Sequence, residues 1–119
     1  MEIKPKQIKE TISFDDFDKL DIRVGTITSV SEVAKSNKLM KLMVDFGDHI
    51  RSILAGIKQE RNNPKEIEGK QALFILNLPE KKMAGEVSQG MLFDIGYEDK
   101  LIPCLAVPEI PMPNGSNCG

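Results

Sequence analysis

Side chains that perform catalysis or bind metals are scarce in this 119-residue chain, which has one histidine, one tyrosine, two cysteines and no tryptophan. A nucleophilic triad or dyad would have to use His49, whose polar surroundings are typical of a solvated turn between two strands. Zinc sites need several Cys or His ligands at short spacing, which Cys104 and Cys118 do not provide. No glycine-rich phosphate-binding loop is present. The sequence therefore predicts a binding module that is not an enzyme and uses no cofactor or metal.

Signals for secretion and membrane insertion are also absent. No apolar run approaches the roughly 20 residues of a membrane-spanning helix, and the first ten residues lack the apolar core of a signal peptide. Two cysteines cannot build a disulfide framework, so both thiols are expected to be reduced. We therefore expect a cytoplasmic protein with no membrane partner, and a length of 119 residues favours a single domain.

Charge is unevenly distributed, although the whole chain has a formal charge of only −2. Residues 1–34 and 83–119 are acidic, whereas residues 35–82 carry ten Lys or Arg and six Asp or Glu, a net charge of +4. A nearly neutral protein can therefore present a basic stretch to an anionic partner. The alternative is that these cations only solvate an ordinary surface.

Alternating apolar residues predict short strands along most of the chain. Leu20, Ile22 and Val24 share one face of the first strand, and the alternation changes phase after Gly25, as at a bulge or a sharp bend. In a later strand, apolar residues at positions 91, 93 and 95 form the expected inner face. Further strands are expected over residues 38–46, 51–55, 71–78, 91–95 and 101–107, with a charged loop at 79–87 and an extended tail after 107.

Two short helical segments interrupt these strands. Ser13 is placed to cap one helical turn over residues 14–17, and Pro64 is placed to begin a short helix between the third and fourth strands. Five or six strands with one helical insert at that point predict an all-β fold, a small closed barrel of the oligonucleotide/oligosaccharide-binding (OB) type. A β-sandwich is the alternative architecture.

Several short motifs follow one another in an order that is specific as a set, although each alone is weak. They are the segments 21–25 (DIRVG), 36–39 (SNKL), 51–57 (RSILAGI), 69–70 (GK), 77–78 (NL), 81–83 (KKM), 85 (G), 88–91 (SQGM) and 113–115 (PNG). Together they resemble the tRNA-binding domain found at the C-terminus of many methionyl-tRNA synthetases and in stand-alone dimeric tRNA-binding proteins. The resemblance covers about residues 13–116, so residues 13–119 are expected to form a tRNA-binding OB domain after an N-terminal extension, residues 1–12.

The resemblance implies binding of tRNA by shape and backbone, as a stand-alone protein or as an accessory domain or β subunit of methionyl-tRNA synthetase. The residues that match the family's RNA-binding positions are Asn37, Lys38, Arg51, Lys81, Lys82, Ser88, Gln89 and Met91. The cations among them would neutralise phosphates, and the polar residues can hydrogen-bond to phosphate, ribose or base. Met91 would pack against a base or, alternatively, belong to the barrel core. For the lysine pair, the alternative is a solvated loop.

Some positions depart from the family pattern. Asn37 stands where Asp is frequent, Glu80 and Ala84 stand where Pro and Arg are frequent, and Gln89 replaces the usual Glu. The loss of a cation at position 84 and the gain of a carboxylate at position 80 predict weaker attraction to phosphate.

Six aromatic residues are present, and four of them fall at positions expected in the core. Binders of single strands rely on several exposed aromatic platforms. The chain is therefore expected to recognise a folded RNA rather than an extended single strand.

A branch of the same family resembles secretion-linked chaperones, so a protein-interaction factor is the alternative function. That branch tends to lack a Lys-Leu and a Gly-Ile pair, which are present here as Lys38-Leu39 and Gly56-Ile57, so tRNA binding is favoured. The resemblance also implies a homodimer, and an apolar strip from Ile110 to Met112 would be exposed in a monomer. Methionyl-tRNA synthetase is a further candidate partner.

Overall fold

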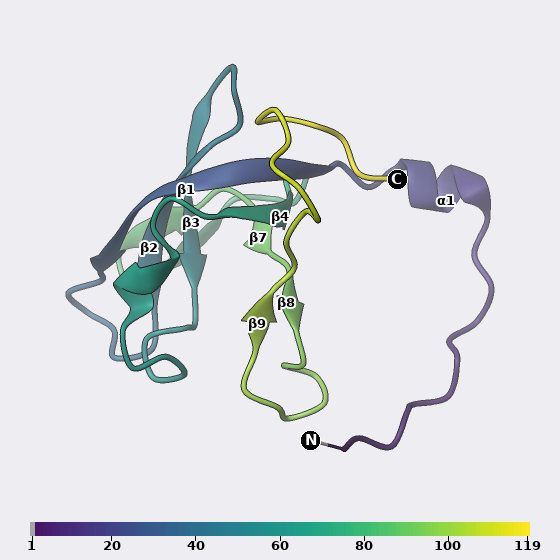
Figure 1. The fold of residues 1–119 in the computed structure, drawn as a ribbon, viewed down its shortest axis with the longest axis horizontal. Helices are drawn as coiled ribbons and strands as arrows, with labels where there is room; N and C mark the ends of the chain where they lie inside the picture. Colours follow the sequence, from purple (N-terminus) through teal and green to yellow (C-terminus); the bar gives the residue numbers. More distant parts are fainter. Residues whose placement is uncertain (1) are drawn as a thin grey trace.

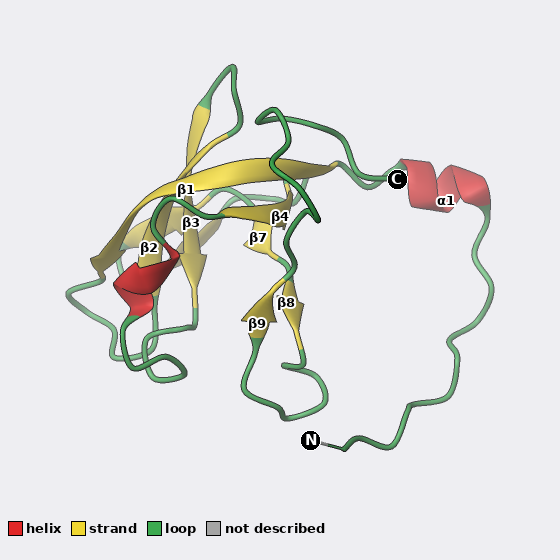
Figure 2. Ribbon diagram, viewed as in Figure 1, coloured by secondary structure: helices red, strands yellow, loops and turns green. Residues whose placement is uncertain are grey.

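A strongly curved antiparallel sheet forms the body of the molecule in the computed structural model, which describes residues 2–119 (Figure 1). The strand order is β3-β2-β1-β4-β7, and β3 also contacts β6 and β7, which brings the two edges of the sheet together. The strands are β1 (Ile22–Glu32), β2 (Met40–Asp45), β3 (Ile50–Ala55), β4 (Gln71–Ile75) and β7 (Met91–Leu92). A 3₁₀ helix, η1 (Pro64–Ile67), lies between β3 and β4 (Figure 2). The predicted OB-type barrel is confirmed.

Strand β1 is long because it belongs to both halves of the barrel. It pairs with β4 up to Thr26 and with β2 from Thr26 onward, and the register shifts between Ile27 and Ser29. The expected change of phase after Gly25 is present, since Val24 and Ile27 are both buried. The bulge, however, follows Ile27 rather than Gly25. Leu20 is 45% exposed and lies before the strand, so its predicted place on the inner face is wrong.

The core lies inside the barrel and follows the alternation of β2. Leu42 and Val44 of β2 are fully buried between half-exposed neighbours. Phe46 meets Phe74 of β4 edge to face, with ring centroids 5.5 Å apart. Ile67 of η1 is completely buried, and burial of each such side chain contributes roughly 1.5–3 kcal/mol. The helix therefore closes the barrel with an apolar residue, which explains its place between the third and fourth strands of the sheet.

The predicted loop at 79–87 is wrong, because this segment is a hairpin. Strand β5 (Lys81–Met83) pairs with β6 (Glu86–Ser88). Ala84 and Gly85 join them with φ values of 51° and 81°. Positive φ at both central residues is the geometry of a type I′ turn, whose twist matches that of the flanking strands.

The predicted strand over 91–95 is divided, and its inner face is assigned to the wrong residues. Leu92 is buried and pairs with Phe74, whereas Met91 is 46% exposed. After Leu92 the chain leaves the barrel and enters a second hairpin of β8 (Asp94–Ile95) and β9 (Cys104–Leu105). This hairpin replaces the predicted strand over 101–107. The alternation fails because the two halves of the segment pair with different partners.

The two terminal segments lie on the outside of the barrel. Helix α1 (Phe14–Asp18) is capped by Ser13, whose Oγ accepts a hydrogen bond from the Asp16 amide at 3.0 Å, as predicted. The C-terminal tail returns to β1, where the Ser116 carbonyl accepts from Val24 at 2.9 Å and the Gly115 amide donates to Val24 at 2.8 Å. The PNG motif is therefore part of the fold. Within residues 2–119, no helix is long and apolar enough to cross a membrane.

Candidate nucleic-acid interface

The barrel closes along a seam between β3 and residues 88–90, and two predicted RNA-binding residues lie in it. Ser88 is 4% exposed, and its Oγ accepts from the Leu54 amide at 3.0 Å and donates to the Gly90 carbonyl at 3.1 Å. The Gln89 amide donates to the Ser52 carbonyl at 2.8 Å, and Gln89 Oε1 accepts from the Ser52 amide at 3.0 Å. Side chains thus supply acceptors that a neighbouring strand would normally offer. Both side chains therefore help to hold the seam closed.

Arg51 fastens the same seam from β3. Its Nη1 donates to the Leu76 carbonyl at 2.8 Å and to the Gln89 carbonyl at 3.1 Å, and its Nε donates to His49 Nε2 at 2.9 Å. Because two bonds to backbone carbonyls and one to the His49 ring hold the guanidinium in place, Arg51 orders the surface beside it. Its contribution to an anionic ligand is the positive charge that it retains.

His49 lies in the predicted turn but is not the solvated side chain that the sequence indicated. Its ring stacks on Phe46 with centroids 5.5 Å apart, and its side chain is only 35% exposed. Arginine cannot accept a hydrogen bond, so His49 Nε2 must be unprotonated. Nδ1 therefore carries the proton and donates to Asp48 Oδ1 at 2.6 Å. This hydrogen bond lowers the pKa of the Asp48 carboxyl.

In the hairpin β5–β6, the side chains of the two predicted lysines point in opposite directions. Lys81 pairs with Ser88 and Lys82 with Val87, so the two side chains point to opposite faces of the ribbon. Both are exposed, and neither forms an ion pair within residues 2–119. Glu86 lies on the face of Lys81 and pairs with Lys41 of β2 at 3.3 Å. The Lys81 face is therefore the one turned toward the barrel.

The loop between β1 and β2 lies beside the tip of this hairpin. A Cβ placed on Gly85 would lie 3.9 Å from the Cδ atom of Lys35. Within the loop, Ser36 Oγ accepts from the amides of Lys38 and Leu39 at 3.1 and 3.0 Å, which fixes a compact turn. Asn37 and Lys38 are exposed on this turn. The loop that carries the exposed Lys35 and Lys38 thus lies beside the tip of the hairpin that carries the exposed Lys81 and Lys82.

A groove of about 520 Å³ opens beside the same loop. Lys38 and Met91 line it, together with three residues that the sequence prediction missed, Glu60, Asp94 and Tyr97. Tyr97 is 65% exposed. In the sequence, Tyr97 is marked only as the single tyrosine, in a polar segment without strand alternation. This does not distinguish a side chain that binds a ligand from an ordinary loop residue.

Burial and charge act together on the carboxylates of the groove. The walls desolvate Asp94 and raise its pKa, and the negative charge of Glu60 raises it further, against a smaller lowering by Arg61. No group of three or more His, Cys, Asp or Glu side chains among residues 2–119 could hold a metal ion.

Comparisons with known proteins identify the family of the chain. The sequence profile of the family described as "Putative tRNA binding domain" matches residues 22–117. The chain is 45% identical over 93 residues to a methionine–tRNA ligase of Chlorobium chlorochromatii, covering 78% of this chain and 13% of that enzyme. It is 43% identical over 114 residues to the ligase of Parabacteroides distasonis, covering 95% of this chain and 16% of that enzyme. The chain therefore spans only a small part of these relatives.

Two solved structures of similar proteins are matched by this chain along their whole length. A MetRS-related protein from Pyrococcus horikoshii superimposes with a TM-score of 0.85 and 34% identity, over 93% of this chain and all of that one. The CsaA chaperone protein from Picrophilus torridus superimposes with a TM-score of 0.79 and 30% identity, over 92% of this chain and all of that one. The profile match, the ligase relatives and the shared barrel show that this chain belongs to the tRNA-binding domain family.

Proposed function

We propose that the chain binds folded tRNA as a non-catalytic, cytoplasmic module. The observation that carries this proposal is the position of the loop with Lys35 and Lys38 beside the tip of the hairpin that carries Lys81 and Lys82. Phosphates of a folded RNA would be neutralised there by Lys35, Lys38 and Lys81, with release of counterions. Contacts of this kind follow the path of the backbone, so they select the shape of an RNA more than its sequence.

The predicted RNA-binding residues take two roles in this proposal. Four of them have exposed side chains and would touch RNA directly: Asn37, Lys38, Lys81 and Met91. Lys82 is also exposed, but it points to the opposite face of the hairpin and would add only its charge. The seam residues, Arg51, Ser88 and Gln89, would hold the surface in shape, because their hydrogen bonds close the barrel. A rigid surface loses less conformational entropy when it binds, which favours affinity.

The relatives support action beside methionyl-tRNA synthetase, either as part of that enzyme or as a separate subunit. The matched ligases are much longer than this chain, while the MetRS-related protein is matched along its whole length. In either arrangement, residues 13–119 would be the RNA-binding domain and residues 1–12 an extension. The aminoacylation chemistry would belong to other parts of the enzyme.

Exposed apolar side chains support a homodimer. Ile8, Ile12 and Phe14 at the front of the chain are 94%, 62% and 89% exposed, and Ile110 and Met112 in the tail are 63% and 41% exposed. Apolar surface of this extent is usually covered by a partner. Two copies would also double the surface offered to one tRNA.

The test is binding of total tRNA compared with single-stranded RNA of equal length and with duplex DNA, each across a salt series. We expect tRNA to bind most tightly, with an affinity that falls linearly in the logarithm of salt concentration. Equal affinity for poly-U and tRNA at matched salt would overturn the proposal.

A protein-interaction factor is the second candidate, because the similarity to the CsaA chaperone protein extends over all of that chain and because the exposed apolar residues would suit a peptide ligand. The two candidates are separated by assaying suppression of aggregation of an unfolded model protein. Suppression without any tRNA binding would favour the second candidate.

A further inference from the structure

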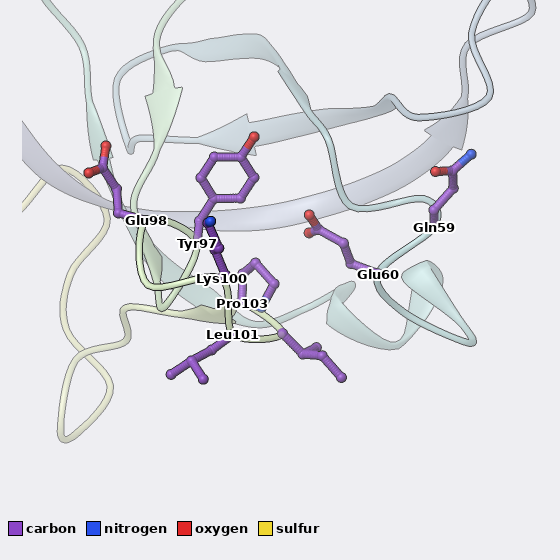
Figure 3. Close-up of a pocket in the computed structure, with 8 residues that line it drawn as sticks. Gln59, Glu60, Tyr97, Glu98, Lys100, Leu101 and Pro103 are labelled. Atoms are coloured by element: carbon purple, nitrogen blue, oxygen red, sulfur yellow. The ribbon is translucent and has the colours of Figure 1, made fainter. Parts of the chain in front are cut away.

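The groove beside Lys38 continues into a second hollow on the other side of Tyr97. The second hollow measures about 680 Å³ and is lined by Lys100, Glu98 and residues 101–103 (Figure 3). Gln59, Glu60 and Tyr97 line both hollows. Tyr97 and Glu60 therefore form the common wall of one extended groove, with Lys38 in one half and Lys100 in the other.

Tyr97 is held on a firm turn although its ring is exposed. The Lys100 amide donates to the Tyr97 carbonyl at 3.1 Å, and the Leu101 amide donates to the Gly96 carbonyl at 3.0 Å. Lys100 has a φ of 60°, which an L-residue other than glycine adopts at a cost and which is frequent at functional sites. A large aromatic face is thus presented by a backbone that is already ordered.

Glu60 and Asp94 both line the groove beside Lys38. Neither forms an ion pair in the part of the chain that the structure describes, whereas the neighbouring Arg61 is engaged by Glu66 at 2.6 Å. The Asp94 carboxylate is partly desolvated, and the negative charge of Glu60 acts on it unfavourably. Such a pair is stabilised by a ligand that brings N–H donors.

We propose, building on the proposed tRNA binding, that this groove holds one unpaired nucleobase of the RNA. The base stacks on the Tyr97 ring, its Watson–Crick edge donates to the Glu60–Asp94 carboxylate pair, and its flanking phosphates reach Lys38 and Lys100. An exposed aromatic face beside hydrogen-bonding side chains is how proteins read unstacked RNA bases. Guanine is the preferred base, because its Watson–Crick edge alone offers two adjacent N–H donors, at N1 and N2.

The direct test is titration of the ¹⁵N-labelled chain with GMP and with UMP, followed by NMR. We expect GMP to shift the amide signals of Glu60, Asp94 and Tyr97, and UMP to bind at least about fivefold more weakly. Tyr97→Ala removes binding of both nucleotides, while Tyr97→Phe keeps it because the stacking face remains. Glu60→Gln reduces the preference for GMP to less than about twofold. Equal binding of the two nucleotides, or shifts confined to another surface, would overturn the proposal.

The second arm measures tRNA binding by the same variants. Loss of one base–aromatic stack predicts a decrease of about five- to 150-fold for Tyr97→Ala, with Val107→Ala as an exposed control outside the groove. If the unchanged protein binds tRNA but Tyr97→Ala does so equally well, the base pocket is wrong and the proposed function stands. If the unchanged protein binds no tRNA, the proposed function fails, and the GMP titration still decides whether the groove takes a base.

Discussion

At the candidate interface, the guanidinium of Arg51 is already engaged in hydrogen bonds within the protein, one of them to His49. The hydrogen bond from Arg51 Nε to His49 Nε2 at 2.9 Å joins β3 to the turn before it. His49→Ala removes the acceptor, so we expect the free energy of unfolding to fall by about 1 kcal/mol, measured by guanidinium denaturation. His49→Gln restores an oxygen acceptor and serves as the control, with a smaller loss. Unchanged stability in His49→Ala would contradict this account of the seam.

The ionised Asp94 carboxylate lowers the stability of the folded chain by an amount that depends on pH. Its folded-state pKa lies above the ordinary value of 3.8, mainly because the groove desolvates the carboxylate. The folded chain therefore binds the proton more readily than the unfolded chain, and stability falls as pH rises through the raised pKa. Asp94→Asn removes this penalty, so we expect a higher Tm than that of the unchanged protein at pH 7.

The difference in Tm between Asp94→Asn and the unchanged protein should shrink on acidification and vanish below about the ordinary carboxyl pKa. Thermal unfolding between pH 3 and 7 measures it. A difference that is independent of pH would show that packing, not charge, distinguishes the two side chains. If the groove takes a base, the more stable variant should discriminate less well between GMP and UMP, which is a trade of stability for function.

At the scale of single elements, β1 passes so close to the core at Gly25 that a side chain would not fit there. A Cβ there would lie 2.5 Å from Val44 Cγ1 and 2.7 Å from Phe46 Cε1. Gly25→Ala therefore overpacks the core and should lower the free energy of unfolding by about 1–3 kcal/mol. Gly56 has nothing within 4 Å of such a Cβ, so Gly56→Ala is the matched control and should be nearly neutral. Similar stability of the two variants in denaturant unfolding would contradict this.

Elements with an unbroken period of two could be predicted from the sequence. Strand β2 follows its alternation residue by residue, because each of its faces keeps one environment along its length. The segment after Gly90 could not be read in this way. Met91 and Leu92 pair with β4, while Asp94 and Ile95 pair with β9. A strand that changes partners has no single inner face, so the pattern assigned the wrong residues to the core.

The sequence indicated which residue types surround the candidate site, but not whether each side chain points outward or toward the protein backbone. The sequence brought together the cations and polar residues that surround the barrel edge, but a hydroxyl or amide looks the same whether it meets a ligand or a backbone amide. Ser88 and Gln89 are directed to β3 by the seam, which depends on contacts between distant segments. Tyr97, which lines the groove together with Lys38, was missed because a polar loop gives no sign of which side chain faces a cavity.

The opposite directions of Lys81 and Lys82 predict unequal effects of their removal. An RNA that lies on the barrel side of the hairpin meets Lys81, since this face also carries Glu86 and its partner Lys41. We expect Lys81→Ala to lower the salt slope of tRNA binding by about one, the loss of one phosphate contact. Lys82→Ala is the matched control and should lower it less. Equal slopes for both variants and the unchanged protein would place the RNA elsewhere.

For the whole molecule, the decisive question is what covers the apolar residues at its two ends. The tail cannot be removed to answer it, because Gly115, Ser116 and Cys118 are hydrogen-bonded to β1. Truncation after Pro108 would damage the barrel itself. Side-chain substitutions are the better probe, since Ile110 and Met112 are exposed, and the Met112 backbone keeps its bonds to Gln71 whatever its side chain.

We expect light scattering of the full chain to give about twice its mass of 13.3 kDa. The double variant Ile110→Ser/Met112→Ser should dissociate at concentrations where the unchanged protein is dimeric, because an isologous interface loses apolar area from both copies at once. Ile102→Ser, at a position 80% exposed on the β8–β9 hairpin, is the control and should remain dimeric. A monomeric mass for the unchanged chain would contradict the dimer. The exposed ends would then be left for another partner, such as the remainder of a synthetase.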